Sequence, residues 1–525
     1  MYYDPVLRAN WKAGVTGLLT MHNPYTGTTL KDDPAVAAVV FFNEQFFSWT
    51  PQHCEALDGE WQRWMQKRTG TSKQFPKLQK KLAYTTDPLG IAMSLFIGEK
   101  EAELVDFYLN TVRECGYSGL INTFDNFFSL NRIPAMEKLS IIASHPYCFH
   151  PVYSGKSTLI EQGSSLTGHP GMAERCAFFG KPFFVTEYNH VMWNGFRHEG
   201  TIRGATVAAL QNYSAFIMHS DGVALTQRPM RPFRAADDPI WRGNNLLTYF
   251  IYLREDVAPN PNSIAFYVTD EDIRREGLGE VNFRLGSLGW LARLGILYEH
   301  SNAIGKEFPA LAISPHAGAL RVIGKKLRKP ETALSTEELV RILRQKKLLS
   351  AANRTDPAHG IYHSATEEVL VDVVNQEMRV ITPRLEMQVV KQKDKLFELD
   401  ALTIRSASIP AGIAAISLEK TAALSNSGRV LLVILTDALN SGMKFASQKR
   451  VELQANGKLP VLLRCGTFSM ELKSRLATPT LYALNCSGKR MEEIPIRVQN
   501  GRLSFTIDTG KLKEPAIFFE LVEKS

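Results

Sequence analysis

The sequence is poor in cysteine and contains no long apolar run. Six cysteines are scattered over 525 residues without a C-x-x-C pair: Cys54, Cys115, Cys148, Cys176, Cys465 and Cys486. This distribution argues against a disulfide scaffold and against a structural zinc site. The longest apolar run, residues 35–42, has eight residues, whereas a membrane-spanning helix needs about 20. The sequence therefore predicts no membrane partner.

The first thirty residues also lack the uninterrupted apolar core of a signal peptide. The charged residues Asp4, Arg8 and Lys12 interrupt this stretch, and we expect no export signal in it. The cellular compartment stays open, because an extracellular or periplasmic location would require an export signal in a longer N-terminus.

The net charge of +8 is concentrated in one segment of the chain. Residues 301–350 hold ten Lys or Arg against four Glu, which is six of the eight net positive charges. The segment has one aromatic residue, Phe308, so it offers no platform on which bases could stack. Ser335 and Glu338 form a capping box before an amphipathic helix pattern. We interpret the segment as a solvated basic face and expect no nucleic-acid partner.

The chain is long enough for two or more domains, because a single core stops growing at roughly 250 to 300 residues. Residues 1–250 alternate short apolar runs with helical patterns, which is typical of a parallel sheet covered by helices. The apolar runs span residues 35–42, 119–121, 139–143, 183–185 and 222–225, and the clearest helical patterns span 102–115 and 202–219.

From residue 355 onward the apolar pattern changes to a period of two. Strands are predicted over residues 369–374, 379–382, 430–436, 460–464 and 503–507. Turn signals such as Asn500-Gly501 separate them, so residues 355–525 are predicted to form an antiparallel β-sandwich. Residues 251–354 are predicted to be a connecting α/β region with helices over 288–298 and 336–349. The expected fold class is α/β plus all-β.

Two of the apolar runs lead directly to glutamates. Residues 35–42 end in Asn43-Glu44, and residues 183–185 lead through Thr186 to Glu187. Moving a carboxylate out of water costs free energy. An apolar run that leads to a glutamate therefore either ends at the protein surface or places the carboxylate in a functional site. Parallel strands bring their carboxyl ends to one edge. If the runs are consecutive strands, Glu44 and Glu187 face each other across one pocket.

A retaining glycosidase uses a facing pair of carboxyl groups for catalysis. One group is protonated and assists the leaving oxygen, and the other is ionised and attacks the anomeric carbon. Two like charges this close repel each other, which favours opposite protonation states. A single glutamate at the end of an apolar run is better explained as a residue that merely faces solvent. Two glutamates in the same position on two such runs are better explained as a pair in one site.

The segment Asn43-Glu44, with Glu187 three units later, resembles the clan A glycoside hydrolases. These are retaining enzymes with a (β/α)8 barrel, and they include the cellulase-like family 5 and the family 42 β-galactosidases. The resemblance implies that Glu44 is the acid/base, that Glu187 is the nucleophile, and that Asn43 hydrogen-bonds the sugar 2-hydroxyl. The segment from His145 to Tyr147 resembles a His-x-Tyr of family 5, which implies that these two side chains line the sugar site.

The resemblance also implies that the barrel is partial. A barrel spends about 30 residues on each βα unit, so three units before Asn43 would need about 90 residues, and 42 are present. We therefore expect a partial (β/α)8 barrel that lacks the first strands, truncated at its N-terminus relative to the clan. Such a layer would leave two sheet edges without a partner strand.

The sequence predicts a β-linked oligo- or polysaccharide as substrate, and no cofactor. Trp193 lies shortly after Glu187 and is expected to bind substrate, because sugar rings stack on aromatic faces. Its alternative is core packing. His145, Cys148 and His150 are close in sequence, but alternate residues of an extended segment point to opposite faces, so no metal site is predicted. The oligomeric state stays open, and a homo-oligomer is compatible with the sequence.

These observations predict a retaining glycoside hydrolase that cleaves O-glycosidic bonds of a β-linked glycan through a covalent glycosyl-enzyme. Two alternatives stay open. One is an exo-acting, β-galactosidase-like enzyme, and the other is a carbohydrate-binding remnant with impaired catalysis.

Overall fold

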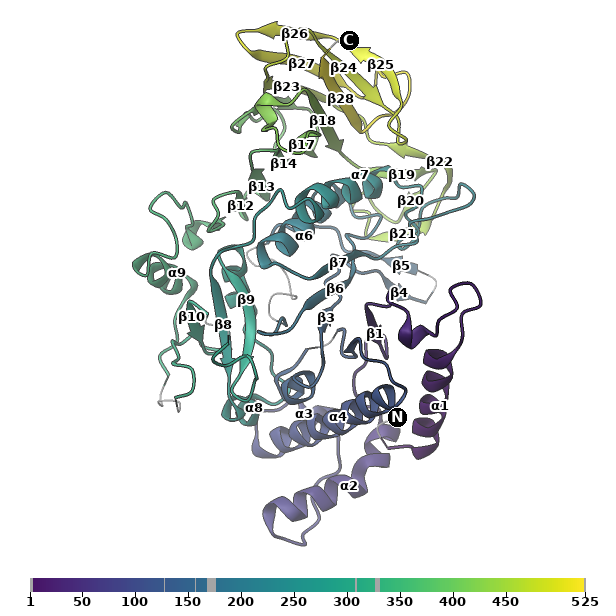
Figure 1. Cartoon of the computed structure of the whole chain (residues 1–525), viewed down its shortest axis with the longest axis vertical. Helices are drawn as coiled ribbons and strands as arrows, with labels where there is room; N and C mark the ends of the chain where they lie inside the picture. The colour runs from purple at the N-terminus through teal and green to yellow at the C-terminus, as the bar shows by residue number, and fades with distance from the viewer. Residues whose placement is uncertain are drawn as a thin grey trace.

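The computed structural model describes residues 3–126, 128–155, 157–167, 176–306, 309–325 and 331–523, and it does not describe the side chain of residue 201. The basic segment predicted over 301–350 therefore lies partly outside the described residues, at 307–308 and 326–330. Figure 1 shows helices and a parallel layer in the N-terminal half, a small α/β unit beside them, and β-rich sheets toward the C-terminus. No helix in these ranges is both long and apolar enough to cross a membrane.

The N-terminal layer contains five strands in the described residues. They are β1 (Ala38–Val40), β2 (Leu120–Asn122), β3 (Ile142–Ser144), β6 (Phe183–Tyr188) and β7 (Ala215–Met218). Strands β1 and β2 pair in parallel, and β3, β6 and β7 form a second parallel sheet. The backbone N–H groups of Ser140 and Ile141 donate to the carbonyl of Ile121 at 3.1 and 3.4 Å, which brings the two sheets together. The carboxyl ends of all five strands therefore lie along one edge.

Helices cover this layer. They are α1 (Pro5–Thr20), α2 (Pro51–Thr69), α3 (Lys80–Ala83), α4 (Pro88–Glu114), α5 (Ile133–Met136), α6 (Arg197–Gln211) and α7 (Pro239–Thr248). Helix α6 lies close behind β6: a Cβ added to Gly204 would stand 2.4 Å from the ring of Tyr188. Because side chains alternate along a strand, packing Tyr188 against α6 directs Glu187 to the opposite face, away from the helix.

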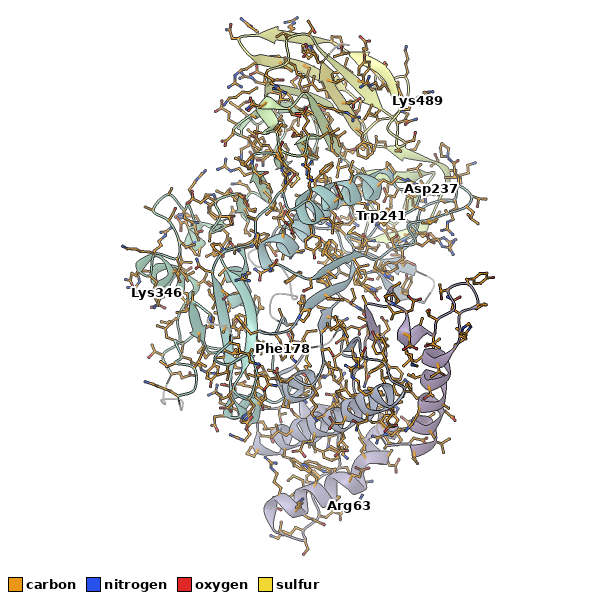
Figure 2. All side chains as sticks on the ribbon, viewed as in Figure 1. Arg63, Phe178, Asp237, Trp241, Lys346 and Lys489 are labelled. Atoms are coloured by element: carbon orange, nitrogen blue, oxygen red, sulfur yellow. The ribbon has the colours of Figure 1, made fainter. Side chains whose placement is uncertain are left out.

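A smaller parallel sheet follows in the chain. Its strands β8 (Ser263–Val268), β9 (Arg293–Tyr298) and β10 (Leu311–Ile313) run in the order β10-β8-β9, with α8 (Asp270–Glu276) and α9 (Thr336–Gln345) beside them. The predicted capping box of Ser335 and Glu338 is confirmed at the start of α9. The N–H of Phe179 donates to the carbonyl of Ile296 at 2.9 Å, which joins this sheet to the N-terminal layer next to Phe178, labelled in Figure 2.

Two antiparallel sheets dominate the C-terminal part of the chain. The first has the order β11-β12-β13-β14-β17-β18-β28-β24-β25, and the second has the order β15-β16-β23-β27-β26. One buried cluster takes residues from both, among them Ile413, Leu432, Phe468, Phe505 and Phe519, so the two sheets pack face to face. The strands are β11 (Ile361–His363), β12 (Val369–Asp372), β13 (Glu377–Ile381), β14 (Leu385–Val390), β15 (Phe397–Glu398), β16 (Leu402–Ala407), β17 (Ala411–Ser417), β18 (Arg429–Leu435), β23 (Thr467–Lys473), β24 (Pro479–Leu484), β25 (Arg490–Ile494), β26 (Ile496–Gln499), β27 (Arg502–Asp508) and β28 (Phe518–Glu523).

A third, small sheet links the C-terminal part to the N-terminal layer. It has the order β20-β21-β5-β4 and combines β4 (Val152–Ser154) and β5 (Ser157–Leu159) with β20 (Lys444–Phe445) and β21 (Glu452–Ala455). Figure 1 shows these strands side by side with the paired strands β19 (Ala438–Ser441) and β22 (Lys458–Leu463). Residues nearly 300 positions apart in sequence, such as Thr158 and Leu453, are thus register partners.

Three sequence predictions about secondary structure are wrong. The helix predicted over 202–219 ends at Gln211, because Asn212 adopts a left-handed conformation that caps it, and the following residues form β7. The strand predicted over 222–225 is absent, and Val223 and Leu225 are exposed. The helix predicted over 288–298 is a 3-10 segment, Phe283–Trp290, followed by strand β9. In the first and third cases an apolar run that forms a strand was assigned to a helix, which short runs allow.

The mixed helix and strand content and the large C-terminal antiparallel region are confirmed. The interpretation of the N-terminal layer as part of a (β/α)8 barrel stays a prediction, as do the domain boundaries at residues 250 and 354. Within the described ranges β1 and β7 each have a strand partner on one side only. Val40 and Ile217 on these two strands are 39% and 48% exposed.

Candidate active site

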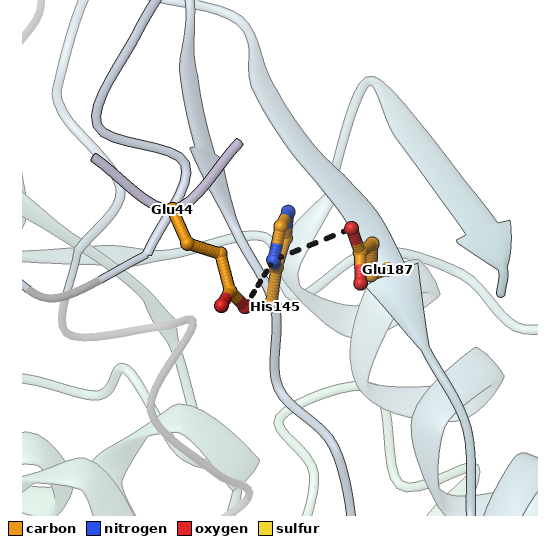
Figure 3. A group of neighbouring side chains, drawn as sticks. All are labelled: Glu44, His145 and Glu187. Atoms are coloured by element: carbon orange, nitrogen blue, oxygen red, sulfur yellow. Dashed lines mark hydrogen bonds and ion pairs between the residues drawn. The ribbon is translucent and has the colours of Figure 1, made fainter. Parts of the chain in front are cut away.

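Polar side chains gather where the five parallel strands end. Glu44 follows β1, Asp125 follows β2, His145 follows β3, Glu187 lies near the end of β6, and His219 follows β7. Because the strands run parallel, residues separated by up to 175 positions meet along one edge of the layer. Figure 3 shows the central group, with His145 between Glu44 and Glu187.

The two carboxylates face each other at short range. One oxygen of Glu44 and one of Glu187 lie within 4.8 Å of each other, and their side chains are 35% and 18% exposed. Retaining glycosidases hold their two carboxyl groups about 5 to 5.5 Å apart, whereas inverting enzymes leave about 6.5 to 9.5 Å for a water molecule. The closest oxygens of Glu44 and Glu187 are near enough for both to contact one small group bound between them.

His145 lies between the carboxylates and is enclosed by a third. Its Nδ1 is 2.9 Å from Glu44 Oε1 and 3.6 Å from Glu187 Oε1, and its Nε2 is 3.4 Å from Asp125 Oδ2. Burial alone lowers the pKa of His145, but the hydrogen bonds to Asp125 and Glu44 and the nearby negative charges outweigh it and raise the pKa above its ordinary value. Each ring nitrogen therefore faces a carboxylate oxygen that can accept a hydrogen bond, and the raised pKa favours the protonated, positively charged form of the ring.

Asp125 also holds the backbone that carries Glu44. The N–H of Glu44 donates to Asp125 Oδ1 at 2.6 Å, and the φ angle of Glu44 is 52°, in the left-handed region that residues other than glycine rarely adopt. Asn126 Nδ2 donates to Glu44 Oε1 at 3.0 Å. Such a conformation persists only where its surroundings impose it, and here the loop after β2 imposes it.

Tyr147 fixes the second carboxylate. Its hydroxyl donates to Glu187 Oε2 at 2.5 Å. Burial and the hydrogen bond to Glu187 raise the pKa of Tyr147 far above its ordinary value, so the phenol stays protonated and remains a donor. His219 Nε2 lies 4.0 Å from the same oxygen. The rings of Tyr147, His219 and Phe233 pack edge to face, with centroids 5.6 to 6.0 Å apart.

A cavity of about 630 Å³ opens beside this group. Glu44, His145 and Tyr147 line it together with Phe128, Phe149 and His150. The volume lies in the range of small-molecule sites, and the aromatic side chains give the cavity apolar surface.

Among the residues that the structure describes, two groups of side chains have the spacing of metal ligands: Glu44 with His145 and Glu187, and Asp270 with Glu299 and His300. In the first group both nitrogens of His145 face carboxylates, and the protonated form of the ring has no lone pair to offer a metal. These residues fit a protonated imidazole better than a metal ion. The second group lies at the ends of β8 and β9, where Tyr298 donates to Asp270 at 2.6 Å.

The structure brings together four of the six residues predicted for the site: Glu44, His145, Tyr147 and Glu187. Asn43 is exposed in the turn after β1. Trp193 is fully buried, and its indole N–H donates to the carbonyl of Arg450 at 2.6 Å. It is among the residues that line a second cavity, of about 400 Å³, and its role in substrate binding stays a prediction.

Sequence reasoning missed Asp125, Asn126, His219 and Phe233 as site residues. The first three follow strands at the same edge as Glu44, so the rule that identified the glutamates could have found them. Phe233 lies in a turn far from any strand end, and no sequence signal pointed to it.

No family model matches this chain, and no curated protein matches it. A solved structure of a cold-adapted β-galactosidase from Rahnella sp. R3 is similar over 97% of this chain and 82% of that chain, with a TM-score of 0.39 and 10% sequence identity. A likeness at this level carries no argument about family or activity.

Proposed function

We propose that this protein is a retaining glycoside hydrolase acting on a β-linked oligo- or polysaccharide. The observation that carries the proposal is the pair Glu44 and Glu187, with oxygens within 4.8 Å of each other at the carboxyl edge of a parallel layer. We also propose that the five strands correspond to the last five of a (β/α)8 barrel, because all five contribute site residues from the same edge.

In the proposed reaction Glu187 is the nucleophile. Tyr147 donates to its Oε2 and so orients the carboxylate, which leaves Oε1 to attack the anomeric carbon. As the new C–O bond forms, the bond to the leaving oxygen breaks and that oxygen takes a proton from Glu44. Glu44 then removes a proton from water, which attacks the anomeric carbon and releases Glu187. No cofactor takes part in these steps.

The charge on His145 has a defined role in this scheme. An imidazolium 2.9 Å from Glu44 and 3.6 Å from Glu187 stabilises the ionised Glu187 before attack, and it stabilises Glu44 once Glu44 has given its proton to the leaving oxygen. Asp125 in turn stabilises the imidazolium from its far side.

The second candidate function is carbohydrate binding without turnover. The exposure of Val40 and Ile217 favours it, because these residues lie on the edge strands of the layer that would have to hold the catalytic pair rigidly. An exo-acting, β-galactosidase-like enzyme is a version of the first proposal, and analysis of the first products from an oligosaccharide distinguishes it from an endo-acting enzyme.

Hydrolysis of 4-nitrophenyl β-glycosides in the gluco, galacto and manno series tests the proposal. We expect Glu187→Gln to lower kcat/KM by at least about 10³-fold, whereas Glu299→Gln, a matched change after β9, leaves it unchanged. Glu44→Ala should be rescued by azide, with a β-glycosyl azide as product, and NMR should find the released sugar in its original anomeric form. Undiminished hydrolysis by Glu187→Gln would refute the nucleophile assignment, and glycan binding by a wild-type protein with no turnover would favour the second candidate.

A further inference from the structure

A second cavity, of about 400 Å³, lies next to the carboxylate pair. Its lining includes Tyr153, Asp221, Arg231, Phe233, Arg234 and Asn456. Phe233 lines this cavity, and its ring centroid is 5.6 Å from that of Tyr147 and 5.8 Å from that of His219. Tyr147 and His219 are the two side chains beside Glu187 Oε2, so Phe233 connects the lining of the cavity to the immediate surroundings of Glu187.

A tight turn presents two arginines in this cavity. The N–H of Arg231 donates to the carbonyl of Arg234 at 3.2 Å, and the N–H of Arg234 donates to that of Arg231 at 2.9 Å. The turn therefore holds the two arginines on either side of Phe233. Both are exposed, and neither forms an ion pair with any residue that the structure describes.

The acidic residue in this lining, Asp221, pairs with Arg228 at 2.5 Å. Asp237 does not line the cavity, and one of its oxygens accepts the backbone N–H of Arg228 at 3.1 Å. Farther from the centre, Arg450 pairs with Asp437 at 2.7 Å. The net charge that faces a ligand is therefore positive and comes from Arg231 and Arg234.

The C-terminal region anchors this turn. Asn440 accepts the N–H of Met230 at 2.9 Å and donates to its carbonyl at 3.0 Å, and Asn456 donates to the same carbonyl at 3.1 Å. Met230 immediately precedes Arg231, so the backbone at the start of the turn is held by residues more than 200 positions away in sequence.

We propose that this cavity is a subsite for an anionic sugar, one that carries a carboxylate or a sulfate group. The guanidinium fork matches both groups through paired hydrogen bonds, and Phe233 and Tyr153 provide apolar faces for the sugar ring. The inference rests on the proposed function, because it places the anionic sugar next to the bond that Glu44 and Glu187 cleave.

Calorimetric titration with matched tetrasaccharides tests the inference. The probes are β-1,4-linked tetrasaccharides of the gluco, galacto and manno series, each in a neutral, a C6-carboxylate and a 6-sulfate form. The Glu187→Gln variant serves as the binding protein, so that no probe is consumed. We expect at least one anionic form to bind about 10-fold more tightly than its neutral partner at low salt, and the difference to shrink as salt rises. The carboxylate and sulfate arms identify which anion is preferred.

Arg231→Gln with Arg234→Gln, in the same background, should abolish this difference, because the affinity for the anionic form falls to that of the neutral form measured with the same variant. The control is Arg63→Gln with Arg341→Gln, which removes the same charge from exposed positions on α2 and α9 and should preserve the preference. Equal affinity for neutral and anionic forms, or a preference that survives loss of both arginines, would overturn the inference. Hydrolysis of neutral probes by the wild-type protein would show in that case that the proposed function stands by itself.

Discussion

Strands β17 and β7 show how differently the two halves of the molecule use a sheet. All seven residues of β17 are buried: Ile413 and Ala415 face the five-stranded sheet, while Ala414 and Ile416 join the core of the N-terminal half. Strand β7 has no fully buried residue. A strand that is buried on both faces, such as β17, contributes side chains to the core. A strand without a partner along one side, such as β7, leaves space for a functional site.

The two regions are not independent. A Cβ added to Gly412 on β17 would stand 2.6 Å from the carbonyl of His198 on α6, so the nine-stranded sheet packs directly against the helix that supports β6. The rigid region thus supports the strand that carries Glu187. Stability and chemistry are thus divided between the two halves of the molecule, and mutations in each half can test this division.

The largest expected effect is on stability, in the C-terminal core. Phe519 on β28 is fully buried between the two antiparallel sheets, and Phe519→Ala should lower the free energy of unfolding by about 3 to 5 kcal/mol. Denaturant unfolding followed by circular dichroism measures this. Activity per folded molecule should be retained, and a loss of less than about 1 kcal/mol would contradict the assignment of this region as the rigid core.

The next effect is on activity, in the open region. Asp125→Asn removes the charge behind His145 and weakens the contact that holds the backbone of Glu44, so kcat/KM on an aryl glycoside should fall about 10²-fold. Asp106→Asn, at an exposed pair with Lys138, is the matched control. If Asp125→Asn lowered only thermal stability and left activity intact, Asp125 would have no positioning role.

Tyr147→Phe should have a smaller effect on activity. The variant keeps the ring that packs against His219 and Phe233 but loses the hydrogen bond to Glu187. A hydrogen bond to a charged group contributes about 1.5 to 3 kcal/mol, which corresponds to a loss in kcat/KM of roughly 10- to 100-fold. Steady-state kinetics on the same aryl glycoside measures it, and an unchanged kcat/KM would show that Tyr147 does not orient the nucleophile.

The pH dependence of stability should reveal the charge on His145. Its pKa is raised in the folded state, so its contribution is fully present below the unfolded pKa of about 6.5 and is lost as pH rises through the folded pKa. Wild type should therefore lose stability above about pH 6.5 relative to His145→Asn, which lacks the titrating group. Unfolding curves from pH 5.5 to 9 measure the difference, and parallel curves would contradict an imidazolium at this position.

The smallest effect is expected at the edge of the parallel layer. Ile217 on β7 is 48% exposed, so Ile217→Ala should change the free energy of unfolding by less than about 1 kcal/mol. Ile413→Ala, the same change on β17, should cost about 2 to 5 kcal/mol. If the two variants lost equal free energy of unfolding, β7 would be covered in solution, and the two strands would not differ in burial.

Much of the fold was predictable because local patterns decided it. The period of two predicted strands within β12, β13, β18, β22 and β27, and the capping box at Ser335 predicted α9. The errors at 202–219 and 288–298 arose because an apolar run suits a helix and a buried strand equally well. There, pairing of β7 with β6 and of β9 with β8 decided the outcome.

The sequence by itself determined which reactive side chains are available: two glutamates at the ends of apolar runs, and a His-x-Tyr segment between them in sequence. Only the tertiary structure decided that Asp125 faces both the backbone of Glu44 and the ring of His145, and that strands near residue 450 anchor a turn with two arginines. The physical reason is the separation in sequence of the residues that determine each feature. Strand ends and periodicity are properties of neighbouring residues, whereas a hydrogen bond between residues 81 positions apart exists only after parallel strands have aligned their ends.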